Sequence, residues 1–258
     1  MSGDGKSPVQ CELALITGSG AGSIDGITQI EPLNLDTPYG NPSQGMALVE
    51  WRGQQIIHLP RHGDNHALAP HHINYRANLW ALQQLGVSRI IALGSVGGIR
   101  DALLAPGSLI LPDQLIDYTW GREGSFFDGV VGSLQHIDFT EPFDSQLRGA
   151  LASAAQKVGL KCCNGGVYGV TQGPRLETAA EINRLARDGC DVVGMTAMPE
   201  TALARELGMA YGLLAVVVNA AAGRGSVPIT DEFEQQMAGA VCRALQVIGA
   251  ALSAETGN

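Results

Sequence analysis

The chain has 258 residues and a mass of 27.0 kDa, a size that fits one α/β domain. Hydrophobic residues make up 45% of it and charged residues 16%, which excludes a disordered chain and a coiled coil. Because the formal net charge is −9, we expect neither nucleic acid nor an anionic membrane as a partner. A small molecule is the expected ligand.

The N-terminal residues and the cysteines indicate where the domain begins and in which compartment the protein is expected. Residues 1–10 are polar and predict a flexible tail that precedes a single domain over residues 11–258. The five cysteines form no CxxC pair, which favours free thiols and a cytoplasmic protein. We find no signal-peptide core and no apolar stretch of about 18 residues, so no membrane segment is expected.

The predicted elements alternate between strands and helices along the chain. Apolar runs predict strands over 13–17, 54–59, 89–93 and 108–111, and helical spacing predicts a helix over 73–85 that Gly86 ends. Farther on, helices are expected over 145–158, 178–187, 199–207 and 231–252, with strands over 166–171, 190–195 and 210–218. This alternation indicates an α/β fold: a single domain with a mixed, largely parallel sheet flanked by helices.

Ligands of such sheets bind beyond the carboxyl ends of the strands. Polar side chains follow six of the predicted strands at these ends: Ser19, Arg61 with His62, Ser95, residues 172–177, Thr196 and Asn219. We therefore expect the ligand site there.

The glycine turn over residues 17–23 is not a dinucleotide fingerprint. GxGxxG requires glycine where Ser23 stands, the short-chain reductase pattern requires it at Ile24, and no Tyr-x-x-x-Lys pair occurs. Backbone N–H groups and the Ser19 hydroxyl suit a phosphate-sized anion, although a purely structural turn fits equally well. Arg61 at the next strand end indicates an anion clamp, since a guanidinium pairs with phosphate oxygens in bidentate fashion, or else a surface arginine.

His58, His62 and His66 are spaced by four, as metal ligands on a helix would be. Pro60 and Gly63 interrupt any helix there, so we expect no metal. The chain contains no GxSxG motif, and covalent hydrolase chemistry has no support.

Two polar residues flank the later strands. Glu177 precedes a capping-box sequence, Thr178 with Glu181, so its carboxylate either favours the helix dipole or points into the cleft. Asn219 follows five apolar residues and needs a hydrogen-bond partner if it is buried.

Together these segments resemble the purine nucleoside phosphorylase / methylthioadenosine phosphorylase family over about residues 11–250. The motifs that carry the resemblance are Gly18-Ser-Gly20, Asp36-Thr-Pro-Tyr-Gly40, Arg61-His-Gly63, Asn74-Tyr-Arg-Ala-Asn78, Ser95-Val-Gly-Gly98, Gln114-Leu-Ile-Asp117, His136, Gln172-Gly-Pro-Arg175, Gly194-Met-Thr196 and Met198-Pro-Glu200. The resemblance implies a homotrimer, or a hexamer of two trimers, that cleaves the N-glycosidic bond of a purine nucleoside. Inorganic phosphate is the implied co-substrate, with no metal or organic cofactor.

The resemblance also implies roles for individual residues. The phosphate-binding positions are Ser19, Arg61, His62, Ser95 and Thr196. Met195 matches the residue under the ribose, and His136 matches one that reaches the 5′ end of the nucleoside across a subunit interface. Leu176, Glu177 and Asn219 match purine contacts, and the catalytic set is Asn219, Glu177 and His62.

The base-contacting positions separate the subfamilies. Methylthioadenosine phosphorylases carry aspartates where this chain has Asn219 and Ala221. An amide donates to a 6-oxo group and accepts from a protonated N7, while Glu177 accepts from N1–H, which adenine lacks. The base is therefore expected to be a 6-oxopurine.

The segments expected to contact the sugar resemble those of methylthioadenosine phosphorylases. Asp36-Thr-Pro-Tyr-Gly40 and the His136 segment match that type, and Ile229 and Phe233 offer apolar contacts for a methylthio group. We therefore expect S-methyl-5′-thioinosine as the substrate. Inosine or guanosine, and S-methyl-5′-thioadenosine, remain alternatives, as does a nucleoside-binding protein without turnover.

Overall fold

A computed structural model describes residues 9–21, 24–129, 133–226 and 229–255, the side chains of 230–235 excepted. Of the tail expected at residues 1–10, residues 1–8 lie outside the described residues. Val9, near the end of the predicted tail, is partly buried and packs against the core.

A mixed sheet forms the centre of the described chain. Its strands are β1 (Leu13–Thr17), β2 (Thr28–Pro32), β3 (Ala47–Trp51), β4 (Gln54–Pro60), β5 (Arg89–Gly98), β6 (Leu109–Leu111), β7 (Gln114–Asp117), β8 (Cys162–Asn164), β9 (Val167–Val170), β10 (Val192–Gly194) and β11 (Ala210–Ala220). They run in the order β2-β3-β4-β1-β5-β10-β9-β7, and β5 also pairs with β11, which leads on to β6 and β8. Parallel pairs outnumber antiparallel ones, which confirms the predicted largely parallel sheet.

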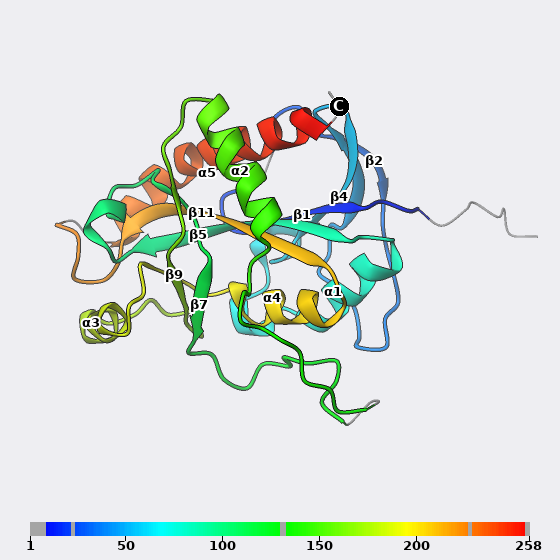
Figure 1. Cartoon of the computed structure of the whole chain (residues 1–258), viewed down its shortest axis with the longest axis horizontal. Coiled ribbons are helices and arrows are strands. Elements are labelled where there is room, and N and C mark those ends of the chain that lie inside the picture. The colour runs from blue at the N-terminus through cyan, green and yellow to red at the C-terminus, as the bar shows by residue number, and fades with distance from the viewer. Residues whose placement is uncertain (1–8, 22–23, 130–132, 227–228, 256–258) are drawn as a thin grey trace, which may run out of the picture.

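Helices cover both faces of this sheet (Figure 1). Their bounds are α1 (Tyr75–Gln84), α2 (Ser145–Lys157), α3 (Ala179–Arg187), α4 (Ala197–Glu206) and α5 (Ile229–Glu255). Helices α2 and α5 lie on one face, and α1 and α4 on the other. Because side chains alternate along a strand, Leu13 and Leu15 of β1 join the α2–α5 core while Ala14 and Ile16 join the α1–α4 core.

Every predicted helix and strand is present, but four strands were missed: β2, β3, β7 and β8. Strand β2 is an edge strand whose residues are largely exposed and include Glu31 and Pro32, so it lacks the apolar run that the prediction relied on. The predicted capping box is confirmed, since Thr178 Oγ1 accepts from Glu181 N and a Glu181 carboxylate oxygen accepts from Thr178 N.

Helix α5 departs from the expectation about apolar stretches. Its segment Gln236–Ala254 is long and apolar enough to cross a membrane by length and composition. However, 44% of the segment is buried, and α5 packs against β11 and α2. This contact pattern is that of a core helix.

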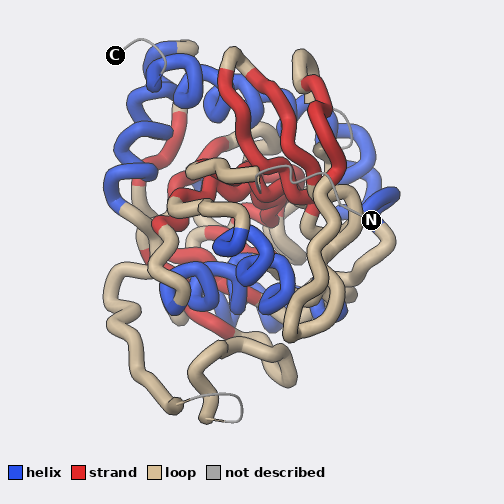
Figure 2. The backbone as a smooth tube through the Cα atoms, turned by 90° about the vertical axis from the view of Figure 1, so that its right-hand side faces the viewer, coloured by secondary structure: helices blue, strands red, loops and turns tan. Residues whose placement is uncertain are grey.

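The fold brings the ends of distant strands together. β1, β4, β5, β9, β10 and β11 end near one another. Gly18 follows β1, and a Cβ there would lie 2.7 Å from Arg61 Nη1, so a larger residue would displace the guanidinium. The long segment between β7 and α2 extends away from the sheet at the lower end of both views (Figures 1 and 2).

Candidate active site

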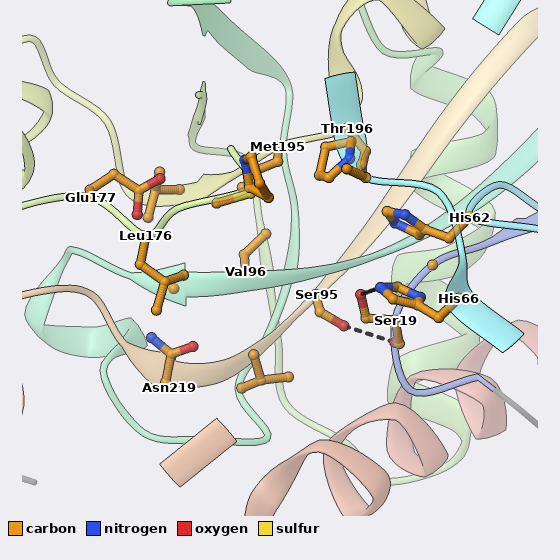
Figure 3. A pocket seen from close by; sticks show the side chains of 18 of the residues that line it. Ser19, His62, His66, Ser95, Val96, Leu176, Glu177, Met195, Thr196 and Asn219 are labelled. Carbon is orange, nitrogen blue, oxygen red and sulfur yellow. Dashed lines mark hydrogen bonds between the residues drawn. The ribbon is translucent and has the colours of Figure 1, made fainter. Parts of the chain in front are cut away.

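A cavity of about 450 Å³ lies at these strand ends, within the range of small-ligand sites. The structure brings nine of the predicted site residues to its wall: Ser19, Arg61, His62, Ser95, Leu176, Glu177, Met195, Thr196 and Asn219. Figure 3 shows Glu177, Leu176 and Asn219 at one end of the cavity, and Ser19, Ser95, His62 and Thr196 at the other. His136 is exposed and does not line this cavity.

The hydroxyl-rich end is suited to an anion. Ser95 Oγ donates to the carbonyl of Ser19 at 3.2 Å, which ties the turn after β1 to strand β5. Thr196 precedes α4 and makes no capping hydrogen bond; its hydroxyl interacts with Tyr168 at the wall of the cavity.

His62 adds a neutral imidazole to this end. Its Nδ1 lies 2.7 Å from the carbonyl of Leu68, and because a carbonyl only accepts, Nδ1 carries the proton. Burial, together with the nearby charges of Arg61 and His66, lowers the pKa of His62 to about 4. Nε2 is therefore an acceptor at neutral pH.

Arg61 differs from the expected bidentate clamp. Its Nε and Nη2 each donate to Glu200 at 2.9 Å, and Nη1 donates to the carbonyl of Leu93 at 2.8 Å. Three of its five donors are thereby used, and the bidentate edge faces Glu200 and not the cavity. The expectation of a bidentate grip on the anion is wrong. Arg61 lies behind the anion end as a buried charge.

Glu200 is the centre of a buried polar cluster. The Arg61 and Glu200 side chains are each 1% exposed, and Tyr211 Oη donates to Glu200 at 2.6 Å. Burial by itself lowers the pKa of Arg61, but the Glu200 carboxylate outweighs burial and holds that pKa above its ordinary value. Burial and the Glu200 charge raise the pKa of Tyr211 well above its usual value. Arg61 therefore keeps its charge at neutral pH.

The opposite end presents an amide and a carboxylate. Strand β11 shifts register between Val217 and Asn219, and this bulge turns the buried Asn219 toward the cavity. Asn219 Nδ2 donates to the carbonyl of Ala220 at 2.8 Å, which leaves Oδ1 and a second N–H for a ligand. Glu177 Oε1 accepts from Thr171 Oγ1 at 2.5 Å.

Two supporting residues escaped the sequence reasoning. Thr171 orients Glu177, and Arg122 donates to the carbonyls of Thr171, Gln172, Met195 and Met198 and to the Gln172 side chain. Arg122 thus joins the loop that carries Glu177 to the loop that carries Met195. No sequence signal marks it, because most of its partners are backbone carbonyls 49 to 76 residues away.

The histidine spacing does not produce a metal centre. His58 bonds Thr17 Oγ1 at 2.9 Å, and burial lowers the pKa of His58 to about 4. Within the described ranges, no group of three or more His, Cys, Asp or Glu side chains is arranged to hold a metal ion.

A search for related proteins places the chain in a known family. The model of the phosphorylase superfamily matches residues 12–253, nearly the whole chain. The chain belongs to the phosphorylase superfamily. The predicted resemblance and the predicted enzyme class, a phosphorylase-type glycosyl transferase, are thereby confirmed.

Individual relatives agree with this membership. A probable S-methyl-5′-thioinosine phosphorylase of Xylella fastidiosa is 52% identical over 213 residues, or 83% of this chain and 86% of the relative. A probable 6-oxopurine nucleoside phosphorylase of Moorella thermoacetica is 41% identical over 220 residues, or 85% and 84%. The crystal structure of a double mutant of adenosine/methylthioadenosine phosphorylase from Schistosoma mansoni, in complex with adenine, has a TM-score of 0.88 at 28% identity and covers 96% and 93%.

Proposed function

We propose that this enzyme cleaves S-methyl-5′-thioinosine with inorganic phosphate, yielding hypoxanthine and 5-methylthioribose 1-phosphate. The observation that carries the proposal is the pairing of an amide, Asn219, with a carboxylate, Glu177, at one end of the cavity. The names of the relatives from Xylella fastidiosa and Moorella thermoacetica support a 6-oxopurine nucleoside.

The free groups of these two side chains match a 6-oxopurine. Asn219 keeps one N–H for the 6-oxo group and Oδ1 for a protonated N7. Glu177 has one oxygen engaged by Thr171 and the other to accept from N1–H. A 6-aminopurine would present a donor to the amide N–H and no proton to the carboxylate.

The reaction is a displacement at C1′ of the sugar. The C1′–N9 bond breaks through an oxocarbenium-like centre while an oxygen of monohydrogen phosphate bonds to C1′, and the purine leaves with the electron pair. The proton that the phosphate gives up ends on the purine nitrogen. The free N–H of Asn219 stabilises the negative charge that develops at the 6-oxo group, while Glu177 orients the base through N1–H. Ser19, Ser95 and Thr196 surround the phosphate with hydroxyl groups beside the sugar, with Arg61 behind them, and Met195 lies under the ribose. His62 Nε2 accepts the hydrogen of a monohydrogen phosphate. The residues assigned here leave no step to a metal or organic cofactor.

We further propose a cytoplasmic homotrimer, or a hexamer of two trimers, acting in nucleoside salvage. Exposure of His136 is consistent with a role at a neighbouring subunit's 5′ site. Ile229 lines the cavity as an apolar neighbour for the methylthio group, whereas the side chain of Phe233 lies outside the described part of the chain.

The decisive experiment compares kcat/KM for methylthioinosine, inosine and methylthioadenosine. We expect methylthioinosine to rank first, and a preference for methylthioadenosine would contradict the roles of Asn219 and Glu177. Hypoxanthine release must also require added phosphate. Release without it would refute a phosphorylase, and binding without turnover would favour a nucleoside-binding protein.

A further inference from the structure

The anion end of the cavity lacks a surplus of positive charge. Among the described residues that line it, Arg61 is the only permanent cation, and Glu200 pairs with it through two hydrogen bonds of 2.9 Å. Glu177 adds a carboxylate at the other end. A doubly charged anion would therefore be desolvated without a net cation to balance it, which is unfavourable unless the protein takes up a proton.

His66 is placed to take up that proton. It lines the same cavity, with Nε2 3.2 Å from Ser19 Oγ and its ring 4.1 Å from the ring of His62 (Figure 3). Asn65 and His66 both have left-handed backbone conformations, with φ of 56° and 57°. This unusual turn for non-glycine residues aims the imidazole at Ser19.

The hydroxyl of Ser19 has a single proton to donate. If His66 Nε2 accepts that proton, none is left for an anion. If His66 Nε2–H donates to Ser19 Oγ, the hydroxyl proton is free to point into the cavity. Whether His66 Nε2 carries a proton therefore decides whether Ser19 is an anion donor, and Nε2 carries one both in the neutral Nε2–H tautomer and in the imidazolium; of these two forms only the imidazolium also supplies the positive charge that the cavity lacks.

We propose that His66 takes up a proton when the anion binds, and that its Nε2–H then holds Ser19 with the hydroxyl directed at the anion. His66 is thus a positioning residue that also supplies charge. The inference rests on the proposed function, because it takes phosphate as the ligand.

His66 is a better proton acceptor than its neighbour His62. His62 is 6% exposed, and its Nδ1–H is committed to Leu68, whereas His66 is exposed. Partial desolvation at the cavity wall lowers the pKa of His66. A nearby anion raises the pKa of a histidine by about 1–3 units and so opposes this effect.

The other groups near His66 are less suited to take up the proton. Asp64 lies on the same turn, and His58 lines the adjoining cavity, where its Nε2 is engaged by Thr17. From α5, the described side chains that line the two cavities, Ile229 and Met237, are uncharged.

The test is calorimetric titration of the intact enzyme with sulfate and with phosphate, in two buffers of different ionisation enthalpy. Sulfate stays doubly charged near neutral pH, so any proton taken up with it is taken up by the protein. We expect the enzyme to take up about one proton per sulfate bound. The affinity for sulfate should then fall about tenfold for each unit by which the pH rises, over the pH range in which the proton is taken up.

The variant His66→Asn isolates the imidazole, because asparagine tolerates the left-handed backbone. We expect it to lose the proton uptake and to raise KM for phosphate about tenfold or more, with KM for the nucleoside unchanged. His72→Asn, which removes an exposed imidazole outside the cavity, is the matched control and should behave as wild type.

The proposal would be overturned by no proton uptake by the wild-type enzyme, or by undiminished uptake by His66→Asn. Equal losses in phosphate and nucleoside KM would also overturn it, since they would show a structural role. Each of these outcomes is compatible with phosphorolysis. Failure of the proposed function is a separate result, namely no phosphate-dependent release of the base.

Discussion

The buried pair of Arg61 and Glu200 allows a sharp test of how the site is supported. Replacing Glu200 by glutamine preserves size and one acceptor oxygen but removes the charge opposite a guanidinium that is itself 1% exposed. Two charge-assisted hydrogen bonds of 2.9 Å and one from Tyr211 of 2.6 Å converge on this carboxylate. The variant leaves Arg61 charged, buried and without its counter-ion.

Removing one partner of a buried ion pair costs about 3–5 kcal/mol. A protein of this size loses about 2–4 °C in Tm per kcal/mol, so Glu200→Gln should lower the apparent Tm by about 6–20 °C. Thermal unfolding by circular dichroism at fixed protein concentration measures this shift. Added phosphate should stabilise the variant more than the wild type, because the anion replaces the missing counter-ion.

Glu123→Gln is the matched control. Glu123 makes an ion pair of 2.6 Å with Arg76, shorter than the Arg61–Glu200 contact, but its side chain is 73% exposed. Exposed pairs contribute about 0–1 kcal/mol, so Tm should barely change. If both variants shift Tm equally, or if Glu200→Gln costs less than about 1 kcal/mol, the reasoning from burial is refuted.

Two further variants test the base end. Asn219→Asp should raise the kcat/KM ratio of methylthioadenosine to methylthioinosine about tenfold or more, because a mispaired buried hydrogen bond costs on the order of 1–3 kcal/mol; an unchanged ratio would count against the role of the amide. Thr171→Val removes the donor to Glu177 and should lower kcat/KM for methylthioinosine about ten- to hundredfold, the worth of a hydrogen bond to a charged group. Thr171→Ser keeps the hydroxyl and should retain most of the activity. In Thr171→Val, kcat/KM for methylthioadenosine should fall less than kcat/KM for methylthioinosine, whereas equal losses on both substrates would point to a folding defect.

Local patterns carried the prediction of the elements and of the site's location. Apolar runs such as 13–17 and 210–218 are buried strands because their length and composition leave few alternatives. The strand-end rule then located Ser19, His62, Ser95, Thr196 and Asn219, which meet at one cavity although they are far apart in the chain. The exposed strand β2 was missed because edge pairing leaves little trace in hydrophobicity.

The hydrogen-bond partners of the site residues could not be predicted from local patterns. The sequence alone determined the α/β fold, the family resemblance and which residue types stand at the strand ends, since these follow from short-range patterns and motifs. Only the tertiary structure decided that Arg61 faces Glu200, 139 residues away, and that Arg122 joins two loops through their carbonyls. It also decided that the ring of His66 lies against the ring of His62 and that His66 contacts Ser19. Hydrogen bonds between distant segments depend on how the chain packs, and packing is a property of all the contacts at once.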